Sequence, residues 1–277
     1  MFLRSPRAGR LLLGALLASF LVTGCAGHRP SAPAAGEAKA VYDTFLASQQ
    51  ATTPPVTAFS LTGSMSFAAK NKSGRLRFRF FGNLADPSRL ELTTTMGGPY
   101  ASLREDATEF SAFVPDKNTL YRHPDTRQGA SRLGIPLPFT LREMAALLAG
   151  RFGELAPSRF SSAKKVQDGY QYTFSGDPRL SSLTLDFQGK PRHLTGRGVE
   201  PWRVDFENDE AVPGFSMSVA RKVTLTTPGG ASLVLRVKSV QLRPESYPAA
   251  DLELPVPPQT VIRSLESPED GSPLPDL

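Results

Sequence analysis

The stretch RLRFRFFG, residues 75–82, decides the fold class of this 277-residue chain. Leu76, Phe78 and Phe80 occupy every second position, and an arginine precedes each of them. Because successive side chains of a β-strand point to opposite faces, this alternation predicts a strand with one buried and one solvent-facing side. The outward face carries three cations, either as an ordinary solvated surface or as a patch that binds an anion or a partner: Arg75, Arg77 and Arg79.

The same two-residue period continues on both sides of this stretch. Residues 58–70, AFSLTGSMSFAAK, and residues 89–95, RLELTTT, repeat the alternation. The predicted inward face of the three segments comprises Phe59, Leu61, Met65, Phe67, Leu76, Phe78, Phe80, Leu90 and Leu92. Further strand-like segments follow as far as residue 242, which predicts eleven or twelve strands in all. Nearly all are joined by short turns, and this favours an antiparallel meander.

Two segments have helical rather than strand periodicity. In residues 37–50, EAKAVYDTFLASQQ, the apolar side chains recur at helical spacing, and Pro54 and Pro55 end the pattern. In residues 140–150, TLREMAALLAG, Thr140 and Glu143 have the spacing of a capping box, and Gly150 closes the segment. The apolar face of this second helix comprises Leu141, Met144, Ala145 and Leu148.

A sheet of this length curls toward a barrel, with its apolar face on the concave side. Two short helices are available to cover that face. If they leave space, an apolar cavity results, and such cavities at barrel mouths are common ligand sites. If side chains fill the interior, the same sequence gives a closed core. The sequence leaves both outcomes open.

The amino-terminal residues carry an export signal. Three arginines precede the apolar run LLLGALLASFLV, residues 11–22, which is too short to span a bilayer and therefore predicts a signal peptide. The run ends in LVTGC, which resembles a bacterial lipobox and implies lipid attachment at Cys25. An ordinary secretory signal with an incidental cysteine is the alternative. Cys25 is the chain's single cysteine, which excludes an internal disulfide and fits a lipidated residue.

These patterns divide the chain into four parts. Residues 1–24 are the predicted signal peptide, residues 25–39 a flexible tether rich in Ala and Pro, residues 40–243 the folded domain, and residues 244–277 a proline-rich tail expected to lack regular structure. The formal net charge of +6 falls to +3 when the three arginines of residues 1–24 are removed. A mildly basic chain without cations interleaved with stacking aromatics predicts no nucleic-acid partner.

Residues that would carry catalysis or bind metal are not arranged for it. His123 and His193 stand in separate segments without metal-ligand spacing, and the chain contains no nucleophile elbow or phosphate-binding glycine loop. The acidic run DFENDE, residues 205–210, lacks the spacing of a calcium loop and is interpreted as a solvated hairpin end. We therefore expect a protein that is not an enzyme and needs no cofactor.

Three blocks, in order behind the lipobox, carry a resemblance to a known family. They are residues 76–98, LRFRFFGNLADPSRLELTTTMGG, residues 134–150, GIPLPFTLREMAALLAG, and residues 202–242, which begin with WRVDFEN. Together they make residues 40–243 resemble the LolB family of outer-membrane lipoproteins. Members receive lipoproteins from the soluble periplasmic carrier LolA and insert them into the outer membrane. The resemblance implies an incomplete barrel of about eleven strands with a helical lid over an apolar cavity.

The resemblance also implies roles for particular residues. The nine residues of the predicted inward face would bind acyl chains, and Met96 at the Gly97–Gly98–Pro99 turn would enter the membrane, with Tyr100 at its interfacial zone. Alternatively, Met96 folds back into the core. The implied partners are acylated lipoproteins, a LolA-like carrier and outer-membrane lipids, and we expect a monomer in the outer membrane facing the periplasm. The alternative function is a structural or assembly-accessory lipoprotein with a closed core that binds a protein partner.

Overall fold

The computed structural model describes residues 32–50, 55–69, 72–133, 135, 138–197 and 200–266. The predicted signal peptide, Cys25 and the first part of the predicted tether lie outside these residues, as do residues 267–277. Among the residues described, no helix has the length and apolar character needed to cross a bilayer.

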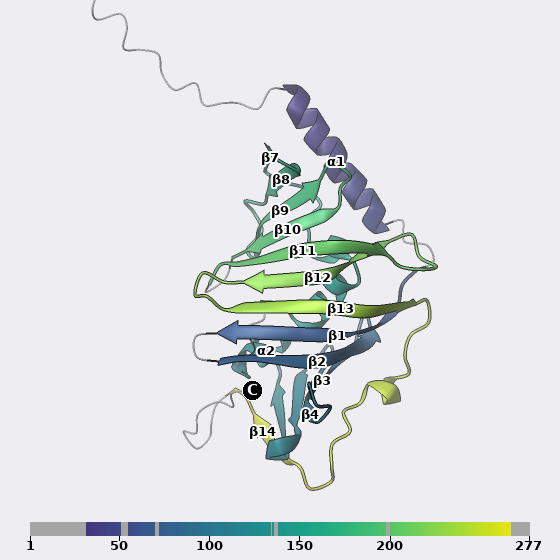
Figure 1. Ribbon diagram of the computed structural model, residues 1–277, viewed down its shortest axis with the longest axis vertical. Helices are drawn as coiled ribbons and strands as arrows, with labels where there is room; N and C mark the ends of the chain where they lie inside the picture. Colours follow the sequence, from purple (N-terminus) through teal and green to yellow (C-terminus); the bar gives the residue numbers. More distant parts are fainter. Residues whose placement is uncertain are drawn as a thin grey trace, which may run out of the picture.

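One strongly curved sheet of fourteen strands dominates the described part of the chain (Figure 1). Its strands are β1 (Ala58–Ala69), β2 (Lys72–Asn83), β3 (Ser88–Thr94), β4 (Pro99–Glu105), β5 (Phe110–Val114), β6 (Thr119–His123), β7 (Ser162–Val166), β8 (Gly169–Thr173), β9 (Leu180–Asp186), β10 (Pro191–Gly196), β11 (Trp202–Ala211), β12 (Ser218–Thr226), β13 (Ser232–Arg243) and β14 (Val261–Ser264). They lie in the order β14-β6-β5-β4-β3-β2-β1-β13-β12-β11-β10-β9-β8-β7. The sheet does not close, because its two ends, β14 and β7, do not pair.

Two meanders make up the sheet, and β1 joins them by pairing with β13 in antiparallel register. The prediction of a mainly β, antiparallel, incomplete barrel is confirmed, with one parallel pair between β14 and β6. The predicted strands missed β7 and β14. The sequence of β7, SAKKV, has no apolar face because it is a largely exposed edge strand. The four-residue β14 follows a proline-rich segment.

The alternation in β1 and β2 places their side chains as expected. Leu76, Phe78 and Phe80 are buried, whereas the three arginines of β2 are exposed. Gly63 on β1 faces the ring of Phe78, and a Cβ there would lie 2.7 Å from that ring. The glycine therefore lets a phenylalanine of the neighbouring strand pack across β1.

The residues that the structure describes form three α-helices beside the sheet: α1 (Ala32–Gln50), α2 (Thr126–Arg132) and α3 (Leu141–Leu148). The predicted capping box of α3 is confirmed, since Thr140 accepts from Glu143 N and the Glu143 carboxylate accepts from Thr140 N. Sequence reasoning missed α2, a short polar helix whose N-cap is Asp125. In Figure 1, α1 lies beside the end of the sheet that carries β7 to β10.

The prediction of a tether as far as residue 39 is wrong for residues 32–39, because α1 already begins at Ala32. Five of the first nine helical residues are alanines, the best helix formers. The proline among them lies in the first turn, where no intrahelical N–H is needed. This composition, interpreted as flexible, extends the helix instead.

The prediction that residues 244–277 lack regular structure is wrong for residues 249–252 and 261–264, whereas the rest of residues 244–266 has neither helix nor strand. A 3₁₀ turn, η3 (Ala249–Leu252), buries Leu252, and β14 then pairs with β6 while Leu265 is fully buried. No proline lies between Pro258 and Pro268, so residues 261–264 keep the N–H groups that a ladder requires. The tail thus passes around the molecule to the free edge of the first meander (Figure 1).

The acidic run at residues 205–210 is also placed differently from the prediction. It lies within β11 rather than at a hairpin end. Its carboxylates pair with cations on neighbouring strands, for example Asp209 with Arg192 (2.7 Å) and Glu210 with Arg221 (2.6 Å). A run of acids on a strand is tolerated because cross-strand partners neutralise it.

Candidate functional site

An apolar pocket lies between the concave face of the first meander and α3. Its walls come from β1, β2, β3, β4 and β13, and its roof from α3 and the segment before it. The lining residues are Met65, Phe67, Leu76, Phe78, Phe80, Leu90, Leu92, Tyr100, Ile135, Met144, Leu148, Leu233 and Leu235. Every one of them is apolar or aromatic, so the pocket suits a ligand without charges in its buried part.

The roof is formed by only three of these side chains. Met144 and Leu148 lie one turn apart on α3 and face the sheet, and Ile135 precedes the helix. Both α3 residues are buried, whereas Ile135 is half-buried. Methionine and leucine make no polar contact that would fix the roof, and methionine adapts to irregular surfaces. These three side chains therefore rest on the pocket by apolar contact alone.

The pocket is small in this form. Its volume is about 70 Å³, although the atom-free space grows to about 770 Å³ when the open mouth is counted. A cavity of about 150 Å³ holds a single benzene ring. The enclosed part therefore cannot accept an acyl chain until α3 or the flexible lining side chains move. The several hundred cubic ångströms expected of an open acyl-chain site are not enclosed.

Seven of the nine residues predicted to bind acyl chains line this pocket: Met65, Phe67, Leu76, Phe78, Phe80, Leu90 and Leu92. The placement of Phe59 and Leu61 in the lining is wrong. Both are fully buried at the other end of β1, where the ring of Phe59 packs edge-on against Phe80 at 5.0 Å between centroids. Alternation identifies the inward face of a strand, but it does not indicate where along that face the interior is filled.

The sequence reasoning missed the other walls of the pocket. Leu233 and Leu235 on β13 lie at least 139 positions after the end of β3 in the chain. They line the pocket only because β13 pairs with β1. Their alternation was visible in SLVLRVK. What could not be seen was which strand would lie next to β1.

The β3–β4 turn carries the predicted membrane-insertion residues. Met96 is 96% exposed, so the alternative that it folds back into the core is wrong. The turn is held beneath it by Gly97 N donating to Thr94 O (3.0 Å) and Thr94 N donating to Gly98 O (2.8 Å), with Gly97 at a φ of 94°. Tyr100 does not stand free beside Met96 but is half-buried in the pocket wall.

The mouth of the pocket and the Met96 turn lie at the same end of the sheet. Among the lining residues on strands, the half-buried ones are Met65, Phe67 and Tyr100. Tyr100 immediately follows the turn at Pro99, and Phe67 pairs with Gly74 near the start of β2. An exposed methionine thus stands beside the opening of an apolar pocket. We call this end of the sheet the Met96 rim: residues 94–100 with the facing ends of β1 and β2.

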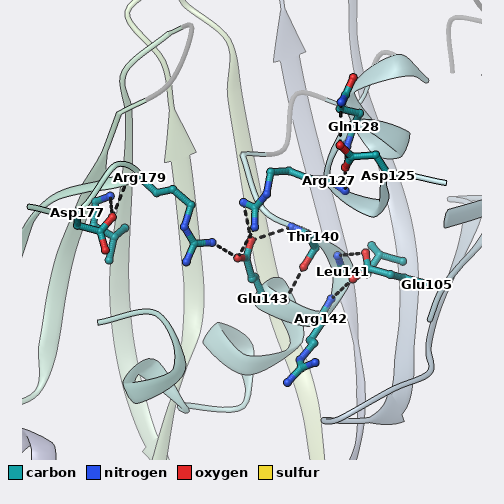
Figure 2. Close-up of polar contacts among 11 residues, drawn as sticks. Glu105, Asp125, Arg127, Gln128, Thr140, Leu141, Arg142, Glu143, Asp177 and Arg179 are labelled. Atoms are coloured by element: carbon teal, nitrogen blue, oxygen red, sulfur yellow. Dashed lines mark hydrogen bonds and ion pairs between the residues drawn. The ribbon is translucent and has the colours of Figure 1, made fainter. Parts of the chain in front are cut away.

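A buried carboxylate attaches α3 to the sheet at the N-terminal end of the helix. Glu105, the last residue of β4, accepts from Leu141 N (2.7 Å) and Arg142 N (3.3 Å), two of the otherwise free N–H groups of the first turn (Figure 2). Burial raises the pKa of Glu105 to about 7, because desolvation outweighs the hydrogen bonds that favour the charged form. The hydrogen bonds between Glu105 and the first turn of α3 are therefore sensitive to protonation near neutral pH.

A second contact at the same helix end joins it to two other segments. Glu143 on α3 accepts from Arg127 of α2 (3.0 Å) and also pairs with Arg179, which precedes β9 (Figure 2). Arg127 and Arg179 are both partly exposed, so water screens these pairs and each contributes little stability. They orient α3 across the open side of the sheet. The helix is thus held at its start, while Met144 and Leu148 follow above the pocket.

No group of His, Cys, Asp and Glu side chains in the described part of the chain could hold a metal ion. His123 is buried and its Nδ1 accepts from Asp125 N (2.9 Å), which places it in the N-terminal region of α2. His193 contacts Asp205 and Arg203 on the outer face. His123 and His193 thus each have a structural partner.

No protein-family model matches the chain, and no curated protein matches it. Solved structures do. The chain is similar to a LolA-superfamily protein from Nitrosomonas europaea, with 12% identity, a TM-score of 0.50, and coverage of 78% of this chain and 97% of that one. It is also similar to a putative outer-membrane lipoprotein-sorting protein domain from Vibrio parahaemolyticus (11%, TM-score 0.51, 79% and 97%). A DUF1329-family protein from Desulfovibrio piger matches comparably (11%, TM-score 0.53, 78% and 99%).

These likenesses define the class of fold. An open, strongly curved antiparallel sheet with helices on its concave side is a LolA-like fold, and this chain has it. At 11–12% identity the comparison concerns the fold alone. None of the three similar structures is described as a LolB protein, so the finer resemblance to LolB remains a prediction from the sequence blocks.

Proposed function

We propose that this protein is a non-enzymatic lipoprotein that accepts the acyl chains of other lipoproteins and transfers them into a membrane. The observation that carries the proposal is the apolar pocket whose mouth lies beside the exposed Met96. A LolA-like fold supports a carrier of this kind, and the LolB-like blocks favour the step of insertion over the step of transport. The outer membrane, reached from the periplasm, is the proposed location.

Transfer through this site requires α3 to move. The enclosed volume of about 70 Å³ is too small for an acyl chain, so the incoming chain must displace Met144 and Leu148 from the sheet. No nucleotide is needed, because a graded increase in affinity for the acyl chain, from carrier to pocket to membrane, drives the transfer. Cargo would come from a LolA-like carrier and leave at the Met96 rim.

The experiment is a transfer assay with a purified acylated lipoprotein, a LolA-like carrier and liposomes. Met96→Glu is the informative variant, because a charge costs roughly 2.5 to 3.5 kcal/mol at a membrane centre and less near its surface. We expect this variant to accept cargo from the carrier, to keep its melting temperature, and to lose delivery to liposomes. Met96→Leu is the matched control and should deliver as the wild type does. If Met96→Glu delivers normally, the turn does not insert.

Lipid attachment is proposed at Cys25, which lies outside the described residues. The LVTGC junction motivates it. Mass spectrometry of the mature protein should show cleavage before Cys25 and three acyl chains on that residue. Two or more chains give stable anchoring. An unmodified thiol, or cleavage at another position, would contradict this.

A second function is favoured by one observation. The small enclosed volume of about 70 Å³ also fits a structural or assembly-accessory lipoprotein whose interior never opens further and which binds a protein partner on its outer surface. The two functions differ in whether the folded protein binds an acyl chain at all.

A further inference from the structure

The outer face of the sheet carries a group of arginines that neither the core nor the pocket uses. Arg77 on β2 and Arg236 on β13 are the cross-strand neighbours of Ser64 on β1, one on each side. Arg75 lies two residues along β2, opposite Ser66. All three arginines are exposed, while Ser64 between them is buried although its side chain faces outward. We call these three residues the arginine row.

Carboxylates compensate the cations around the arginine row but not the row itself. Lys222, the next neighbour beyond Arg236, pairs with Glu207 at 2.8 Å, and Arg79 lies 3.7 Å from Glu91 and over the ring of Phe81. Among the described residues, no carboxylate or aromatic ring contacts the three arginines of the row. Cross-strand neighbours are about 5 Å apart, so Arg77 and Arg236 emerge about 10 Å from each other without a counter-ion.

The arginine row lies close to the Met96 rim. Arg77 pairs with Thr93, three residues before Met96, which is about 10 Å along the strand. Arg75 lies two residues further along β2 toward the rim than Arg77. Arg236 lies at the same height as Arg77, because both pair with Ser64. The polar headgroup layer adds about 5 to 7 Å to each side of a bilayer's hydrocarbon core. When Met96 enters that layer, flexible arginine side chains at this height reach the phosphates.

We propose that Arg75, Arg77 and Arg236 bind the headgroups of anionic phospholipids and so hold the Met96 rim against the membrane. The inference deepens the proposed function and rests on it. Apolar insertion of one methionine would give only weak attachment, and electrostatic contacts supply the remainder at roughly five-fold in affinity per arginine. The contacts also orient the molecule, because the row is confined to the outer face of two strands, β2 and β13, that flank β1.

The test uses residues 26–277, which contain every described residue, and vesicles of phosphatidylcholine alone or with about 30% phosphatidylglycerol. The triple variant is Arg75→Gln, Arg77→Gln, Arg236→Gln. The matched control removes the same charge from exposed positions on the two end strands: Lys164→Gln, Lys165→Gln, Arg263→Gln. Co-sedimentation at constant salt measures membrane affinity. A thermal melt and a titration with a fluorescent fatty acid check the fold and the pocket of each variant.

We expect phosphatidylglycerol to tighten binding of the wild type at least ten-fold, the triple variant to lose most of that gain, and the control to keep it within about two-fold. Equal binding by wild type and triple variant, or equal loss in the control, would overturn the inference. The fatty-acid titration separates this from the proposed function. If the pocket binds the fatty acid and the triple variant binds vesicles as the wild type does, the inference about the arginine row is wrong and the proposed function stands. If the pocket binds nothing, the proposed function fails whatever the vesicles show.

Discussion

Two helices cover different parts of the same sheet, and the interiors beneath them differ. Beneath α1, rings fill the space: Tyr42 packs on Tyr172 at 4.7 Å between centroids, and Phe160 packs on both. Hydrogen bonds fix these rings, with the Tyr42 hydroxyl donating to Pro157 O (2.5 Å) and the Tyr172 hydroxyl donating to Ala38 O (2.7 Å). Beneath α3, the interior is lined mainly by leucine and methionine and retains a pocket.

The difference shows that a curved sheet does not itself decide whether its interior binds a ligand. Polar anchors hold large aromatic side chains in one arrangement, so the α1 side behaves as a core. Aliphatic side chains under α3 lack such anchors, and the helix is fixed at its first turn by Glu105 and Glu143. A roof held at one end, over side chains that can rearrange, is suited to opening.

The largest expected effect is on the α1 side. Tyr172→Ala removes a fully buried ring and its hydrogen bond, and we expect a loss of about 3 to 5 kcal/mol in the free energy of unfolding. Met144→Ala on the α3 side should cost about 2 kcal/mol, the low end for methionine, because its side chain already adjoins a cavity. Denaturant titrations of the two variants measure the difference. Equal losses would mean that both interiors are packed alike.

The next effect concerns pH and Glu105. Its pKa is raised to about 7 in the folded state from an ordinary 4.5, so the folded state binds this proton more tightly than the unfolded state. The stability that follows is fully present below about pH 4.5 and is lost as pH rises through about 7, a change of about 3 kcal/mol. Asp86 and Asp106 titrate nearby, and Arg142 lies beside them, so the wild type alone would not isolate this group.

Glu105→Gln removes the titration while keeping an acceptor for the α3 N–H groups. The variant's stability relative to the wild type should therefore increase between pH 5 and pH 8. Thermal melts of both proteins across that interval measure the difference. A constant difference would show that Glu105 titrates in its ordinary range and does not link α3 to pH.

The features that the sequence predicted correctly are those that depend on local contacts. Alternation identified the inward face of β1 to β3, and the capping box at Thr140 located the start of α3. The family resemblance implied an exposed Met96 at the turn of Gly97 to Pro99, with burial in the core as the alternative, and Met96 is exposed. Each of these depends on residues within a few positions of one another.

What sequence missed depends on contacts across the chain. The placement of Leu233 and Leu235 in the pocket requires the β1–β13 pairing. The exclusion of Phe59 and Leu61 from the pocket depends on how side chains pack around them, which alternation does not indicate. The C-terminal segment was expected to be irregular because of its prolines, yet the edge of β6 selects its proline-free residues 261–264. The raised pKa of Glu105 likewise arises from burial between β4 and α3.

The smallest expected effect on stability, and the most direct test of the account, comes from filling the pocket. Met65→Trp places a larger ring at a half-buried position of the pocket wall, and Phe187→Trp makes a similar change at a side chain on the α1 side that is 45% exposed. Neither should change the free energy of unfolding by more than about 1 kcal/mol, because both sites have free space beside them.

The deciding measurement is a titration of these two variants and the wild type with a fluorescent fatty acid. The account predicts saturable binding by the wild type and by Phe187→Trp, and at least ten-fold weaker binding by Met65→Trp. Absence of saturable binding by the folded wild type, or undiminished binding by Met65→Trp, would contradict the claim that the pocket beneath α3 receives acyl chains.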